Sequence, residues 1–124
     1  MWDILFWVYF TNGVMLICHE IDSAYWHEWK LFNIPGGITG FLVFNMAVIP
    51  PFLYGIVLVA QKNPAGLIFA MAAAAVGIFT FCIHIFFLAK GRPEFRAPMS
   101  ILILAAVLAA SAVQAYAALV LLRS

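Results

Sequence analysis

Charged residues are scarce in this sequence: they make up 9% of its 124 residues, whereas 67% are hydrophobic. A soluble globular domain carries about 25% charged residues, so too few are present here to cover a surface that faces water. The net charge is only +1, which gives no support to nucleic-acid binding, since that function leaves a basic footprint. We therefore expect an integral membrane protein surrounded by the lipid bilayer. We do not expect nucleic acid among its partners.

Cysteine is also rare. Cys18 and Cys82 both lie in apolar runs, where free cysteine behaves as a small buried hydrophobe, so we do not expect a disulfide. A cleavable signal peptide is not indicated, because the start "MWDILFWVYF" carries an acid in place of basic residues and no small-residue cleavage site follows. We expect the first apolar segment to be retained.

Apolar runs of about 20 residues, the length that crosses a bilayer, occur four times, at about 2–21, 38–60, 65–89 and 98–122. Nothing in the sequence breaks the first helix before Trp29, so it can continue that far. Pro50 and Pro51 should kink the second helix, because proline removes backbone donors. The connections "NIPGG", "QKNPAG" and "KGRPEFRAP" are short and rich in helix-ending residues. This pattern predicts an all-α protein, a single-domain antiparallel four-helix bundle in the membrane.

Four spans place both termini at one end of the bundle, which we call face A. Lys62 and Arg123 lie at face A, and the opposite end, face B, has four basic residues: Lys30, Lys90, Arg92 and Arg96. Because basic residues concentrate in cytoplasmic loops, face B is predicted to be cytoplasmic and the termini non-cytoplasmic. Arg92, Glu94 and Arg96 are predicted to form a capping loop and not a site.

Three spans each bring a polar side chain to one depth near face B. His19 follows Trp2 by seventeen residues, which is about 25 Å along a helix in an apolar core about 30 Å thick. Asn45 lies seven residues into the second span, and His84 lies six residues before Lys90 at the end of the third. We therefore predict a polar pocket near face B.

The pattern of small residues indicates which way these side chains point. A seam at helical spacing on the third span ends in His84 and contains Gly66, Ala70, Ala73, Gly77 and Thr80. Such residues mark helix contacts in membranes, so His84 should face the bundle. With about 100° per residue, Glu28 falls on the far side of the first helix from His19, and Asp22 on a third side. The predicted lining is His19, Glu20, Asn45 and His84, with Ser23 and His27 at the mouth.

Ionisable groups inside a membrane cost about 2.5–3.5 kcal/mol each on insertion scales and suggest function. His19, Glu20 and His84 form a set of two histidines and one carboxylate, which suits zinc or iron. The same three residues can serve acid–base catalysis on a lipid-like substrate without a metal. In either case Asn45, Ser23 and His27 are predicted to bind the ligand.

Two further interpretations remain open. The segment "FCIHIFF" is also typical of a haem or chlorophyll ligand. Polar residues can equally hold helices together, and the alanine-rich faces of the fourth span could pack against a second copy or a larger membrane complex. The alternative function is therefore an accessory or structural subunit without chemistry of its own.

The segment "HEIDSAYWHEW", followed by "PGG", an asparagine early in the second span, "IHIFF" and "GRPEF", resembles a family of small bacterial four-helix membrane proteins without an established function. The resemblance covers most of the chain. It implies a multi-pass protein of the bacterial inner membrane, and it implies no activity.

Overall fold

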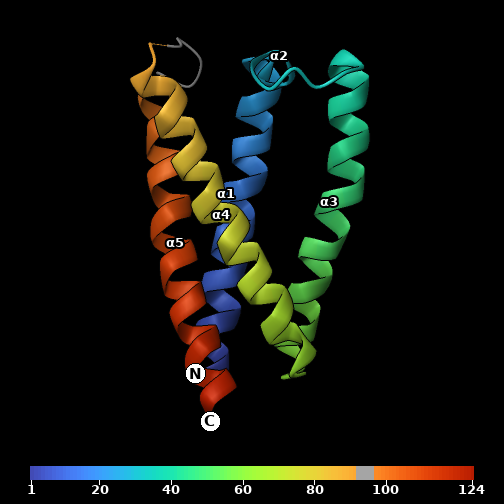
Figure 1. The fold of residues 1–124 in the computed structure, drawn as a ribbon. Helices are drawn as coiled ribbons and strands as arrows, with labels where there is room; N and C mark the ends of the chain where they lie inside the picture. Colours follow the sequence, from blue (N-terminus) through green and yellow to red (C-terminus); the bar gives the residue numbers. More distant parts are fainter. Residues whose placement is uncertain (92–96) are drawn as a thin grey trace.

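The structure, a computed structural model, describes residues 1–91 and 97–124. Within these residues it contains no strand and five helices: α1 (Trp2–Tyr25), α2 (Glu28–Leu31), α3 (Gly37–Ala60), α4 (Ala65–Ala89) and α5 (Pro98–Arg123). The four long helices alternate in direction and form a bundle, and both termini lie at the same end (Figure 1). The prediction of an all-α fold is confirmed.

Each of the four long helices is long and apolar enough to cross a membrane, with a mean hydropathy between 1.4 for α1 and 2.3 for α4. The bounds of α3, α4 and α5 differ by at most one residue from the predicted spans. The first helix ends at Tyr25, so the expectation that it can continue to Trp29 is wrong. The predicted capping loop with Arg92, Glu94 and Arg96 lies outside the described residues.

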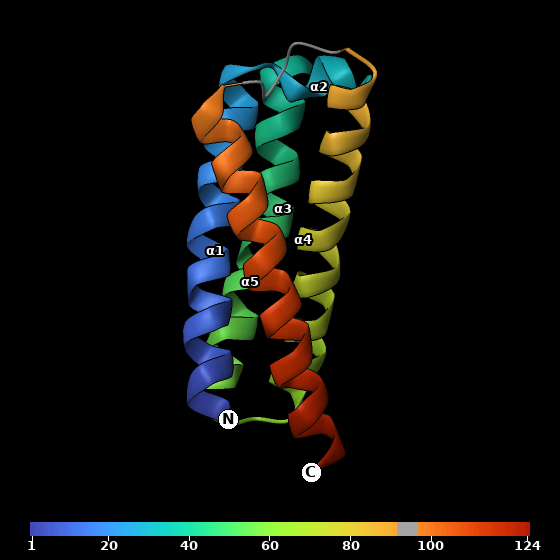
Figure 2. The same cartoon turned by 90° about the vertical axis from the view of Figure 1, so that its left-hand side faces the viewer.

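The long helices form a ring in which α5 packs along α1 and α4, and α3 contacts the same two helices from the other side. The view in Figure 2 shows α5 in front of α1 and α4, with α3 behind. Small residues on α4 allow this close packing. A Cβ atom at Gly77 would collide with the Ser111 hydroxyl and lie 3.2 Å from Cγ1 of Val107. Because α1 and α4 lie across the ring, side chains from both can meet at the bundle centre.

A close contact between α1 and α3 lies in the half of the bundle near the termini. There the Tyr9 hydroxyl donates a hydrogen bond of 2.8 Å to the carbonyl oxygen of Phe52. It occupies the space where a side chain at Gly55 would lie. Helix α3 remains helical through Pro50 and Pro51, and Figure 1 shows it separating from α4 towards the α2 end. This divergence leaves room for a cavity in the half of the bundle near face B.

A buried polar network joins three helices on the opposite side of the ring. The Asn12 side-chain amide donates 3.0 Å hydrogen bonds to the Ser111 hydroxyl and to Oε1 of Gln114. The Gln114 amide in turn donates to the carbonyl oxygen of Ala70 at 2.8 Å. Asn12, Ser111 and Gln114 are fully buried. The network ties α1, α5 and α4 together and does not line the cavity described below.

Candidate metal centre

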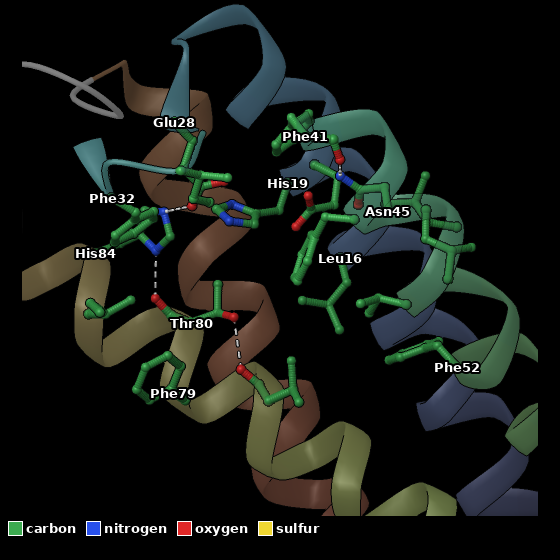
Figure 3. Close-up of a pocket in the computed structure, with 18 of the residues that line it drawn as sticks. Leu16, His19, Glu28, Phe32, Phe41, Asn45, Phe52, Phe79, Thr80 and His84 are labelled. Atoms are coloured by element: carbon green, nitrogen blue, oxygen red, sulfur yellow. Dashed lines mark hydrogen bonds and ion pairs between the residues drawn. The ribbon is translucent and has the colours of Figure 1, made fainter. Parts of the chain in front are cut away.

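Three ionisable side chains from three helices meet at the bundle centre beneath α2, as Figure 3 shows. They are His19 of α1, Glu28 of α2 and His84 of α4, and their ligand atoms all lie within 4.8 Å of one another. The two imidazole rings are perpendicular, with centroids 4.6 Å apart. Exposed fractions of 2%, 8% and 3% show that all three residues are withdrawn from the surface. The structure thus gathers two histidines and a carboxylate in a buried place.

The His84 ring is held in one orientation by its own helix. Its Nδ1 atom lies 2.7 Å from the carbonyl oxygen of Thr80, and because a carbonyl only accepts, Nδ1 carries a hydrogen and donates it. This contact turns Nε2 towards Glu28, whose Oε1 atom is 2.9 Å away (Figure 3). Histidines that bind metals usually donate their second ring N–H to a carbonyl or carboxylate in this way.

His84 and Glu28 form a close pair whose contact requires a shared hydrogen. The Thr80 carbonyl accepts from Nδ1 of His84, and the Glu28 carboxylate, 2.9 Å from Nε2, is a second acceptor. Burial alone would raise the pKa of Glu28, but the hydrogen bond from His84 and the nearby His19 bring it below its ordinary value. An ionised carboxylate beside two imidazoles is an arrangement in which a divalent cation can replace the shared proton.

Ser23 supports two members of this group. Its hydroxyl lies 3.3 Å from Nε2 of His19 and is near enough to the Glu28 carboxylate to help lower the pKa of that group. Ser23 is fully buried one turn after His19 on α1. Supporting hydrogen bonds of this kind fix the orientation of metal ligands. The sequence placed Ser23 at the mouth of the pocket, whereas the structure places it behind the ligand group.

Glu28 reaches the group because the chain reverses after α1. Tyr25 is the last residue of α1, and His27 adopts the left-handed conformation, with φ 57° and ψ 52°. This conformation is unfavourable for a residue with a Cβ atom, and such strain gathers at functional sites. The prediction that Glu28 lies on the far side from His19 is wrong, because it assumed a continuous helix. One signal was available: Glu28 lies beyond the first predicted span, about 2–21, so a membrane crossing does not require the helix to continue to Glu28.

Glu20 and Asn45 line the neighbouring cavity and are not part of the ligand group. The Asn45 amide donates a 2.9 Å hydrogen bond to the carbonyl oxygen of Phe41, and it lies near the Glu20 carboxylate. His27 is exposed, and its ring stacks on Trp29 with centroids 5.0 Å apart. The structure therefore does not bring His27 to the cavity, and it puts Glu28 where the sequence predicted Glu20.

The cavity has a volume of about 410 Å³ and extends from the ligand group along α1, α3 and α4. Small-molecule sites in proteins have volumes of about 300–1,000 Å³. Its walls are mainly aliphatic and aromatic, and its polar residues gather at the end near α2: His19, Glu20, Glu28, Asn45, Thr80 and His84. The candidate ligand group thus lies at the head of an otherwise apolar cavity.

The size of the ligand group fits a metal ion after a small contraction. In tetrahedral coordination two nitrogen or oxygen ligands of one zinc ion lie about 3.4 Å apart, because each bond is about 2.1 Å long. The ligand atoms here are separated by up to 4.8 Å. Side-chain shifts on the order of an ångström therefore bring all three to bonding distance. A three-ligand site of this kind leaves at least one coordination position open, as catalytic zinc sites do.

The chain belongs to a family of unknown function, DUF6713, whose model matches residues 5–121. This match agrees with the resemblance to an uncharacterised family. Neither a search of curated proteins nor a search of solved structures returned a match. Since the family assigns no activity, a functional conclusion has to rest on the geometry of the site.

Proposed function

We propose that this chain is a multi-pass membrane protein that binds a divalent transition-metal ion through His19, Glu28 and His84. The observation that carries the proposal is the buried triplet itself, with its ligand atoms within 4.8 Å of one another. Three helices contribute one ligand each. Burying such groups in an apolar bundle is costly unless they are paired or bind a metal, and a cation between them balances the carboxylate.

The ligand set favours zinc or ferrous iron. Two histidines and one carboxylate bind catalytic zinc in several hydrolases, and the same set binds non-haem iron in oxygenases. Magnesium and calcium prefer oxygen ligands and are disfavoured by two imidazoles. Because three protein ligands leave coordination positions open, and because the cavity adjoins the group, the metal acts on a bound molecule in this proposal and does not only hold the fold together.

In the proposed topology, the four long helices cross the bacterial inner membrane. The metal centre lies about 25 Å along α1 from Trp2, just inside face B of an apolar core about 30 Å thick. Helix α2 covers that end of the bundle (Figure 1). Lys30 and Lys90, with the two arginines of the last connection, support a cytoplasmic position for face B. The termini are then on the non-cytoplasmic side.

Elemental analysis of the protein purified in detergent tests the metal site. We expect about one zinc or iron ion per chain in the wild type and little metal in His84→Ala. The matched control is His27→Ala, because His27 is an exposed histidine outside the group. His84→Gln provides a second variant that keeps polar atoms beside Glu28 in case His84→Ala does not fold.

Three results would contradict the proposal: a metal-free wild type that also fails to bind added zinc or ferrous iron, a His84→Gln protein that folds and keeps the ion, or an equal loss in His27→Ala. A metal-free wild-type protein that copurifies with stable partners would instead favour the alternative of an accessory subunit. Chelator treatment of the wild type provides the reference for a folded but metal-free protein.

A further inference from the structure

The cavity next to the ligand group opens sideways, towards the surface that faces lipid. Several residues line its wall and are also exposed on the outside of the bundle. On α3 these are Phe44 and Val48, with 52% and 41% of their surface exposed, and on α4 Val76 and Phe79, with 50% and 64%. Ile17 of α1 also lines the cavity and is 37% exposed, but the four residues on the two facing helices mark an opening between α3 and α4. The mouth of the cavity therefore lies between α3 and α4, where Figure 1 shows the two helices diverging.

The position of the mouth determines what can enter. Both rim pairs lie within helices that are apolar enough to cross a membrane, several residues from the helix ends. In the proposed topology this mouth opens onto the acyl chains of the bilayer and not onto water. A molecule that enters there must itself be dissolved in the membrane.

One acceptor oxygen at the inner end of the cavity is left without a hydrogen-bond donor. Within the part of the chain that the structure describes, the buried Oε2 atom of Glu20 has no hydrogen-bond partner, although Glu20 lines the cavity. Asn45 lies near the same carboxylate, but its amide donates to the carbonyl oxygen of Phe41. An acceptor left without a donor in an apolar space loses its full solvation energy. A ligand that brings a hydroxyl or an amine to this oxygen removes that loss.

We propose that the molecule acted on by this site is a long-chain lipid whose polar end carries a hydrogen-bond donor, a hydroxyl or an amine. Its chain lies in the apolar part of the cavity, between Val48 of α3 and Val76 of α4, and reaches the site from the bilayer. Glu20 accepts the hydrogen bond of the polar end and places it beside His84. The inference rests on the proposed metal site, since it names the class of molecule that faces the open coordination positions.

Photolabelling of the purified, metal-bearing protein tests this inference. The probe is hexadecanol with a diazirine in its chain and a terminal alkyne, compared with the matching amine and methyl ether. We expect the alcohol or the amine to label α3 and α4 around Val48 and Val76, and the ether, which has no donor, to label this region at least tenfold less. The stronger of the alcohol and the amine identifies the donor.

One matched pair of variants and one single variant locate the effect. Val76→Trp narrows the mouth and should abolish cavity labelling, whereas Val113→Trp on α5 should not, because Val113 is exposed to a similar extent, 47%, and does not line the cavity. Glu20→Gln replaces one of the two acceptor oxygens by an amide nitrogen, which only donates, and should weaken labelling by the preferred probe about tenfold. The metal content of Glu20→Gln should equal that of the wild type.

Labelling spread evenly over all four long helices would overturn the inference, as would equal labelling by the ether or no response to Glu20→Gln. If any of these results occurs in a protein that holds its metal, the metal site stands and the substrate class is wrong. Labelling confined to the cavity of a protein that binds no metal would support the ligand class and overturn the metal site. The two proposals therefore fail by different measurements.

Discussion

Replacement of Glu28 by glutamine tests which of the two carboxylates near the histidine pair, Glu28 or Glu20, binds the metal. Glutamine keeps the length and polarity of the side chain but removes the negative charge that lies 2.9 Å from Nε2 of His84. Residues that only support a metal ligand change affinity by about 10–100-fold when mutated, so loss of a ligand should cost at least about 100-fold. That factor corresponds to about 2.7 kcal/mol. Glu20→Gln lies outside the ligand group and should change zinc affinity less than about threefold.

The assay is a competition titration in detergent, in which metal-stripped protein and a chromophoric chelator share a limiting amount of zinc. Helical circular dichroism of each metal-free variant provides the folding control, because the structure is built from long helices. Glu28→Gln that binds zinc like the wild type would show that Glu28 is not a ligand. A loss in Glu20→Gln as large as that in Glu28→Gln would refute the separation of roles between the two carboxylates.

Three further changes test other parts of the structure. Asn12→Ala removes two buried hydrogen bonds to α5 and should lower the free energy of unfolding by about 1–3 kcal/mol, measured by denaturation in mixed micelles; an unchanged value would contradict the network. Gly77→Val forces a side chain onto Ser111 and should cost about 1–3 kcal/mol, whereas Ala75→Val on the exposed side of α4 should be nearly neutral in the same assay. Because the pKa of Glu28 is below its ordinary value of 4.5 in the folded protein, its contribution to stability is complete above that pH and is lost as the pH falls through the lower folded value. The melting temperature of the metal-free protein should therefore decrease below about pH 4.5, and by less in Glu28→Gln; identical curves would refute this assignment.

The long helices could be predicted closely because one physical requirement determines them. Each must carry enough apolar surface to cross the bilayer, and proline, glycine or charge ends the run on either side. The small residues of α4, such as Gly77, could also be recognised, since close helix packing requires them. The shared depth of His19 and His84 follows from the same regularity, as a constant rise per residue converts sequence position into height.

The turn that brings Glu28 to the histidines could not be predicted from local residues; only the length of the first apolar run left room for it. No glycine or proline occurs between Gly13 and Pro35, so nothing local marks the end of α1. The left-handed conformation of His27 instead allows Glu28 to contact His84, and that contact offsets the unfavourable backbone conformation. Asn12 escaped attention for a related reason: its partners lie 99 and 102 residues away, and no local pattern connects them.

The source of the three ligands has a consequence for how the site is supplied. The imidazoles of His19 and His84 are on the long helices α1 and α4, whereas the Glu28 carboxylate is on the short α2 at the end of the bundle. If both proposals hold, a water-soluble ion arrives from the aqueous end by way of α2, and an oily molecule arrives laterally between α3 and α4. The metal ion and the lipid then use separate routes into the site, and either can be exchanged while the other remains bound.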